Sequence, residues 1–189
     1  MNSNDTPQRY GPLLLTLHWL MALQLVAVYA CINLADLFPK GSDPRALLKT
    51  WHYMLGLSVL AVVAIRVVAR WSGTVPAPEP RTPPWQRWLG ALTHLALYAL
   101  LIAMPVLGWL TLSAAGKEIP FFGMQLPALL GEDHQLAEGL EEIHETVGEI
   151  GYFLVGLHVA AALFHHCIAR DATLVRMLPF LRSRAAPRP

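Results

Sequence analysis

The chain has 189 residues, of which 54% are apolar and only 14% are charged, and its formal net charge is +1. An average soluble domain carries about 25% charged residues, so this composition argues against a soluble protein. A soluble helical bundle is the alternative, but the apolar runs are too continuous for helices that keep one face in water.

Four apolar segments follow one another along the chain, at residues 13–34, 51–71, 88–113 and 147–169. Each is long enough to cross a bilayer as a helix, which takes about 20 residues. The fourth helix is expected to begin before its apolar part, near residue 141. The sequence therefore predicts an all-α integral membrane protein in which residues 1–189 form a single domain, a four-helix bundle.

Two of the connections have distinctive compositions. Residues 72–84 are rich in proline, which predicts a non-helical linker on the side of the two termini. Residues 113–141 contain the apolar stretch IPFFGMQLPALLG, which is broken by Pro120 and Pro127. This stretch predicts either a short interfacial segment or a lid over the far end of the bundle.

An even number of spans places both termini on one side of the membrane. Ten of the 14 lysines and arginines fall on that side, and the four others are Lys40, Arg45, Lys49 and Lys117. Basic residues collect on the cytoplasmic side, so we expect both termini to lie in the cytoplasm. The outer side carries more acidic than basic residues and is expected to be net negative.

Two histidines on the fourth segment are the most informative residues. His144 and His158 are fourteen residues apart, so their imidazoles share one helix face and lie about 21 Å apart along the axis. Gly148 and Gly151 lie between them on this face. Such a face leaves room for flat groups against the helix, and two stacked b-type haems would use it.

Depth in the membrane predicts how the histidines pair. His18 and His158 are near the cytoplasmic side, whereas His52 and His144 are near the outer side. Each pair joins two helices at one level, which is the arrangement of two bis-histidine haem-iron sites in a bundle. Histidines satisfied within the core are one alternative. Zinc is another, although it usually needs three or four ligands at one point.

Other polar residues lie along the same helices. Arg66, fourteen residues after His52, should reach the inner pair, where it would bind a haem propionate or else extend to the membrane surface. His94 could bond a propionate, line a quinone pocket or simply pack. His165, one heptad further along the haem-facing stripe, could donate a hydrogen bond or a proton to a quinone carbonyl. His166 points away from that stripe and is a weaker candidate for this role.

Two lysines lie on the outer side, near the expected position of the outer haem. Lys49 and Lys117 could attract a small anion, or they could be ordinary solvated lysines. His134, in the acidic sequence GEDHQ, is expected to be solvated.

These residues resemble a known family. The resemblance to the bacterial cytochrome b561 family covers residues 9–180 and is carried by RYGPLLLTLHWLMAL, WHYMLGLSVLAVVAIRVVAR, HLALYALLIAMPVLGW, HETVGEIGYFLVGLHVAAALFHH and RDATLVRMLP. It implies an inner-membrane protein that reacts with quinone and binds two b haems through His18, His52, His144 and His158. It also implies an activity like that of superoxide oxidase, which passes an electron from periplasmic superoxide to ubiquinone. The same broad family includes cytochrome b subunits that serve dehydrogenases and hydrogenases.

We therefore expect a di-haem cytochrome that moves electrons from a periplasmic donor to the ubiquinone pool, by oxidising superoxide to O₂ and reducing ubiquinone. The alternatives are an electron-carrier subunit for a partner dehydrogenase or hydrogenase, and a haem-free membrane protein. A net negative outer side would repel superoxide unless Arg45, Lys49 and Lys117 form a local positive patch. The expected partners are membrane lipid, ubiquinone, and superoxide or a protein donor, with no nucleic acid.

Overall fold

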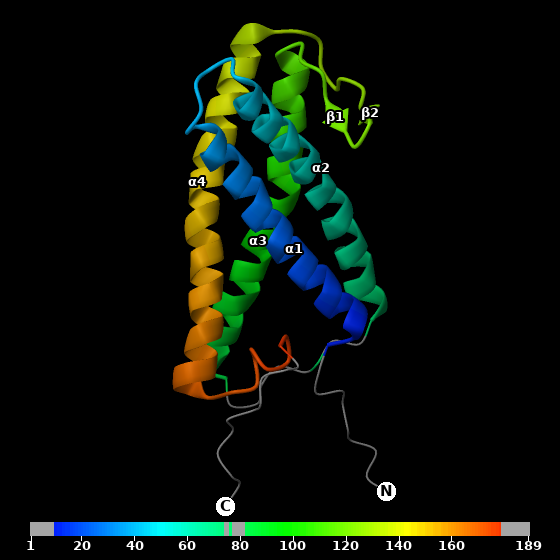
Figure 1. Cartoon of the computed structure of the whole chain (residues 1–189). Coiled ribbons are helices and arrows are strands. Elements are labelled where there is room, and N and C mark those ends of the chain that lie inside the picture. The colour runs from blue at the N-terminus through cyan, green and yellow to red at the C-terminus, as the bar shows by residue number, and fades with distance from the viewer. Residues whose placement is uncertain (1–9, 74–75, 77–81, 179–189) are drawn as a thin grey trace, which may run out of the picture.

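Four long helices and one small hairpin make up the structure, a computed structural model that describes residues 10–73, 76 and 82–178. The elements in chain order are α1 (Pro12–Ala35), α2 (Asp43–Ser72), α3 (Pro84–Ala114), β1 (Pro120–Phe121), β2 (Met124–Gln125), α4 (His134–Phe164) and a single π-helical turn, η1 (His165–Ala169). The two strands pair antiparallel beside α2 (Figure 1). Most of the proline-rich linker predicted at residues 72–84 lies outside the described residues.

The four helices are long and apolar enough to cross a membrane. The first three helices each contain one of the predicted apolar segments and extend beyond it, and the fourth segment spans the end of α4 and η1. Large apolar side chains point away from the bundle, such as Val26 at 69% exposed and Phe153 at 81% exposed. Such side chains would be costly in water and are suited to lipid, so the predicted all-α membrane bundle is confirmed.

The helices begin at recognisable signals. Proline stands in the first turn of α1, α2 and α3, where its missing N–H would have had no helical partner. Asp133 caps α4 by accepting a hydrogen bond from the Leu136 backbone N–H at 3.0 Å, and α4 therefore begins before the expected position near residue 141. The apolar pattern marked only the part of α4 that lies in the membrane.

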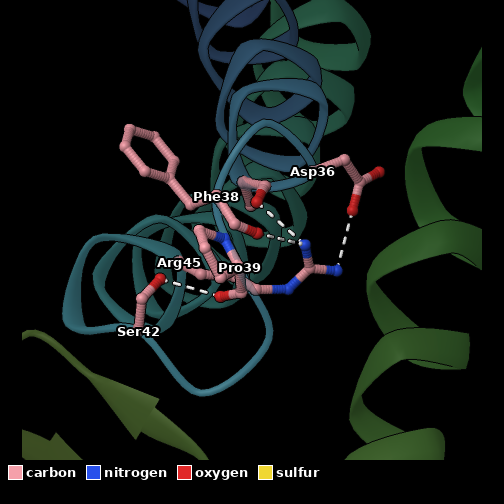
Figure 2. A network of polar contacts seen from close by, with 6 residues as sticks. Asp36, Phe38, Pro39, Ser42 and Arg45 are labelled. Carbon is pink, nitrogen blue, oxygen red and sulfur yellow. Dashed lines mark hydrogen bonds and ion pairs between the residues drawn. The ribbon is translucent and has the colours of Figure 1, made fainter.

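The turn between α1 and α2 is held by one arginine. Figure 2 shows the Arg45 guanidinium donating to the backbone oxygens of Ala35 and Phe38, at 3.0 and 3.1 Å, and pairing with the Asp36 carboxylate at 2.8 Å. The last carbonyls of a helix have no partner within the helix, so Arg45 satisfies the end of α1. Its charge is thereby committed to this turn.

The apolar stretch after α3 packs on the side of the bundle. Ile119 is buried against Leu57 of α2 and Leu112 of α3, and the Trp109 indole N–H donates to the Pro127 backbone oxygen at 3.0 Å. The stretch therefore covers the flanks of α2 and α3 and does not form a lid over the end of the bundle.

The bundle consists of two helical hairpins, α1 with α2 and α3 with α4, and a gap separates α1 from α4. Close backbone approaches join α1 to α2, α2 to α3 and α3 to α4, but among the described residues no Cα atoms of α1 and α4 lie within 8 Å of each other. We call the end of the bundle where α1 begins and η1 lies the inner end, and the opposite end the outer end (Figure 1).

Side chains bridge α1 and α4 about midway along the bundle. The Tyr29 hydroxyl donates to the Gly148 backbone oxygen at 2.9 Å, the Asn33 amide donates to the Tyr152 hydroxyl at 2.5 Å, and the two tyrosine rings lie 4.1 Å apart. A Cβ on Gly151 would meet the Tyr29 hydroxyl and would lie 3.2 Å from Leu100. The glycines of α4 thus admit protein side chains, and the expectation that they leave an open face for flat groups is wrong at this level.

We predict that Gly151→Ala lowers the thermal unfolding midpoint of the protein in detergent, whereas Gly156→Ala does not. Both changes gain about 1 kcal/mol of helix propensity, but nothing lies within 4 Å of a Cβ on Gly156. At Gly151 the added methyl group overpacks the contact with Tyr29, at a cost of about 1–3 kcal/mol. Equal midpoints for the two variants would contradict the proposed packing role of Gly151.

Candidate functional site

Two pairs of histidines face each other across the gap between the helical hairpins. At the inner end, His18 of α1 and His158 of α4 have ring centroids 6.3 Å apart. Nearer the outer end, His52 of α2 and His144 of α4 are also 6.3 Å apart. The four side chains are half-buried. The structure therefore brings together the same two pairs that depth in the membrane predicts.

The spacing within each pair fits a metal ion held between two imidazoles. An imidazole–metal bond is about 2 Å long and the bonding nitrogen lies about 1 Å from the ring centre, so an ion in line between two rings separates their centroids by roughly 6 Å. Direct ring packing would allow a shorter distance. Two pairs with the same spacing, each drawn from separate helices, match the needs of bis-histidine haem ligation.

The two outer histidines are oriented by their surroundings. His52 Nδ1 donates to the Val28 backbone oxygen at 3.0 Å. A carbonyl oxygen can only accept, so the proton is on Nδ1 and the Nε2 lone pair is free for a metal. His144 packs against α3, where a Cβ on Gly108 would lie 3.2 Å from its Cε1 atom. The described residues offer no hydrogen-bond partner to the buried Nδ1 of His144.

A third histidine lies beside the inner pair. The His94 ring on α3 is 5.4 Å from the His158 ring, which is shorter than the spacing within either pair. Two imidazoles at that distance are too close to hold an ion in line between them, so the geometry favours His18 over His94 as the partner of His158. In the part of the chain that the structure describes, no three His, Cys, Asp or Glu side chains gather as a metal site. Zinc usually needs three or four ligands at one point, so the histidine pairs do not fit a zinc site.

Arg66 carries a charge into the inner end of the bundle. Its side chain is buried and donates to the Leu14 backbone oxygen at 2.8 Å. The guanidinium is close enough to His18, His94 and His158 to act on each electrostatically. No carboxylate of the described residues forms an ion pair with it. A buried charge of this kind is costly without a partner, and the carboxylate of a bound ligand would be a suitable one.

The three cations that could form a positive patch at the outer end have different surroundings. Lys49 is half-buried and close enough to His52 to act on it electrostatically, and Lys117 is exposed. Arg45, however, is paired with Asp36, and Glu141 acts on His144 from the same end. Arg45 therefore does not add a free positive charge beside Lys49 and Lys117, because its guanidinium is paired with Asp36 in the α1–α2 turn.

His165 lies where α4 passes into η1 and has an acidic partner. Its Nδ1 donates to the Asp171 carboxylate at 2.5 Å, and the two side chains are only 20% and 12% exposed. Burial alone would raise the pKa of the Asp171 carboxyl, but hydrogen bonds from Thr173 and His165 outweigh it, so the pKa lies below its ordinary value. His166 is half-buried next to this pair.

The prediction that His134 is solvated is confirmed. Its side chain is 78% exposed and pairs with Glu132 at 3.2 Å.

Several residues of the site were not found from the sequence. Asp171 and the bridging Tyr29 and Tyr152 depend on chain segments that meet only in the fold, and Gly108 is one of many glycines. A signal for Asp171 was nevertheless available, because an acid directly after the end of a helix that closes with two histidines is well placed to fold back onto them.

Comparison with known proteins gives a consistent result. Residues 9–180 match the family described as prokaryotic cytochrome b561. The relatives include cytochrome b561 homolog 1 of Escherichia coli (strain K12), at 34% identity over 90% of this chain and 97% of that protein. A probable superoxide oxidase CybB of Yersinia pestis is 30% identical over 91% and 97%, and cytochrome b561 homolog 2 of Escherichia coli (strain K12) is 32% identical over 94% and 95%. With matches that cover nearly the whole chain, and with its membrane bundle of paired histidines, this protein belongs to the prokaryotic cytochrome b561 family.

Proposed function

We propose that this protein binds two b-type haems, oxidises superoxide at its outer end and reduces ubiquinone at its inner end. Membership of the family implies b-type haem and electron transfer in a bacterial membrane. The number of haems, the donor, the acceptor and the orientation, with the inner end in the cytoplasm, are our proposal. The observation that carries it is the pair of matched histidine spacings, 6.3 Å each, at two levels of the bundle.

The chain's own residues hold and orient the two groups. His18 and His158 would hold the inner haem, and His52 and His144 the outer one. Arg66, buried without a carboxylate partner among the described residues, would bind a propionate of the inner haem, with His94 beside it. Two haems at different depths, when bound, supply one-electron carriers that connect a donor on one side of the membrane with an acceptor nearer the other.

The electron balance of the proposed reaction is simple. Two superoxide anions each lose one electron and become O₂, and one ubiquinone gains two electrons and two protons to become ubiquinol. Lys49 would attract the anion to the outer pair, and His165 would donate protons to the quinone oxygens at the inner end. A relative named as a probable superoxide oxidase, at 30% identity, supports this choice of donor.

One observation favours a second candidate, an electron-carrier subunit that receives electrons from a protein partner. The first turns of α4 present Glu138, Glu141, Glu142 and Glu145 as an exposed acidic face, and Arg45 is neutralised by Asp36. A negative surface of this kind slows the approach of superoxide but suits a donor protein with a basic surface.

We predict that superoxide from an enzymatic source reduces the purified, oxidised protein, as followed at the haem α-band, and that superoxide dismutase abolishes this reduction. Added ubiquinone should then reoxidise the haems. A protein that stays oxidised in superoxide, yet is reduced by dithionite and reoxidised by ubiquinone, would contradict the superoxide step and favour the partner-fed carrier.

We predict that His52→Ala and His18→Ala each reduce the haem content from two per chain to one, because each removes a ligand from a different pair. His52→Ala should also abolish reduction by superoxide, since it removes the outer group. The matched control is His134→Ala, which changes an exposed histidine and should leave both haems in place. The measurement is pyridine haemochrome content per chain, and a variant that lost both haems or neither would count against two independent sites.

We predict that Lys49→Glu lowers the second-order rate of haem reduction by superoxide about tenfold at low salt, and that added salt narrows the difference. Lys40→Glu, the same change in the exposed α1–α2 turn, should have a smaller effect. Stopped-flow rates at two ionic strengths test this. Equal effects of the two variants would indicate net charge alone and would remove Lys49 from the proposed site.

A further inference from the structure

The chain reverses direction at the end of α4, and this reversal places an acidic side chain against a histidine. The π-helical turn η1 widens the last turn of the helix, and Arg170 then adopts a left-handed conformation with φ of 54°. This conformation is uncommon for residues other than glycine. It reverses the chain so that the Asp171 backbone N–H donates to the His165 backbone oxygen at 3.1 Å and its carboxylate meets the His165 ring. Such π-turns occur often at functional sites.

The two oxygens of the Asp171 carboxylate accept hydrogen bonds from different donors. Oδ1 accepts from the Thr173 backbone N–H at 2.8 Å, and Oδ2 accepts from His165 Nδ1 at 2.5 Å. An ionised carboxylate only accepts hydrogen bonds, so the Nδ1 proton of His165 is fixed. Nε2 is then the nitrogen that remains for an external group, as a donor when the ring is protonated and as an acceptor when it is not.

The segment that carries Asp171 closes the inner end of the bundle. After Asp171 the chain runs beneath the helices towards α1 (Figure 1), where the Trp19 indole N–H donates to the Met177 backbone oxygen at 2.9 Å. Val175 of this segment is buried, and Trp19 contacts the ring of His18. The pair formed by His165 and Asp171 therefore lies at the same end of the bundle as His18, between the end of α4 and a segment anchored to α1.

We propose that Asp171 is the positioning residue for His165 in the reduction of quinone, holding the ring with its Nδ1 proton on the carboxylate and with Nε2 free. The proton passes from His165 Nε2 to a quinone oxygen, and the pair takes a proton back from water at the inner membrane surface. Two such transfers, with the two electrons delivered by the donor, convert quinone to quinol. A carboxylate behind a histidine holds the ring in one tautomer and orientation in this way, without itself becoming protonated. This inference rests on the proposed reduction of quinone at the inner end.

The test isolates the quinone step from the donor step. The haem-loaded protein is reduced by a stoichiometric amount of dithionite, mixed with a short-chain ubiquinone, and its reoxidation is followed by stopped flow. We expect Asp171→Asn to slow reoxidation roughly tenfold or more, with unchanged haem content and α-band. Asp171→Glu, which keeps the charge, should recover part of the rate. Asp36→Asn, which removes a carboxylate paired with a cation at the opposite end, should leave the rate unchanged.

A double variant separates positioning from a general loss of structure. If Asp171 acts through His165, then His165→Phe combined with Asp171→Asn is no slower than His165→Phe alone. An additive loss would overturn the inference, as would a wild-type rate in Asp171→Asn. A wild-type protein that ubiquinone does not reoxidise would instead overturn the proposed function itself, so the two failures are distinguishable.

A second readout does not depend on electron transfer. Nitrogen NMR of the reduced protein with labelled histidine, with His165 assigned through His165→Phe, reports which ring nitrogen carries the proton. We expect protonated Nδ1 in the wild type and a mixture of tautomers in Asp171→Asn. An unchanged His165 spectrum in Asp171→Asn would show that the carboxylate does not set the tautomer, and the positioning role would be lost.

Discussion

A polar side chain inside a hydrocarbon layer needs a partner, and the arrangement of this bundle follows from that need. Each of the four spans carries histidine, and α2 also carries a buried arginine. Such groups are costly in a membrane unless they are paired or bind a ligand. The bundle pairs the histidines across the gap between two helical hairpins at a common 6.3 Å, and it leaves Arg66 near the inner pair to meet an anion. The positions of the helices are therefore tied to the pairing of these polar side chains.

The gap between α1 and α4 is kept by a small number of side chains. Tyr29 and Tyr152 cross it between the two histidine levels, and Gly151 lets Tyr29 approach α4 closely. This bridge is polar as well as apolar, because the Tyr29 hydroxyl takes a backbone oxygen of α4 as its partner. The two proposed haem sites are thus separated by packed protein, and the width of the gap is set where the tyrosines meet.

The two ends of the bundle differ in a way that suits opposite tasks. The outer end exposes the acidic first turns of α4 and carries a half-buried lysine close to His52. Electrostatic attraction and repulsion therefore influence which electron donors approach this end. The inner end is closed by the segment after η1, which contacts α1 through Trp19 and Met177. Among the described residues, the inner end holds the one ion pair of an acid and a histidine that is mostly buried, His165 with Asp171, where we propose the proton transfer.

The sequence by itself determined the class of fold, the four spans and the pairing of the histidines. These features depend on hydrophobicity and on helical spacing, which are local along the chain, and depth in a bilayer then orders residues on different helices. It did not determine the use of Gly151, the neutralisation of Arg45 by Asp36, or the return of Asp171 to His165. Each of these depends on side chains from separate turns meeting at a few ångströms, and on a left-handed residue at Arg170 that no periodicity encodes. Only the tertiary structure decided them, because contact geometry is set by how helices pack and end and not by their composition.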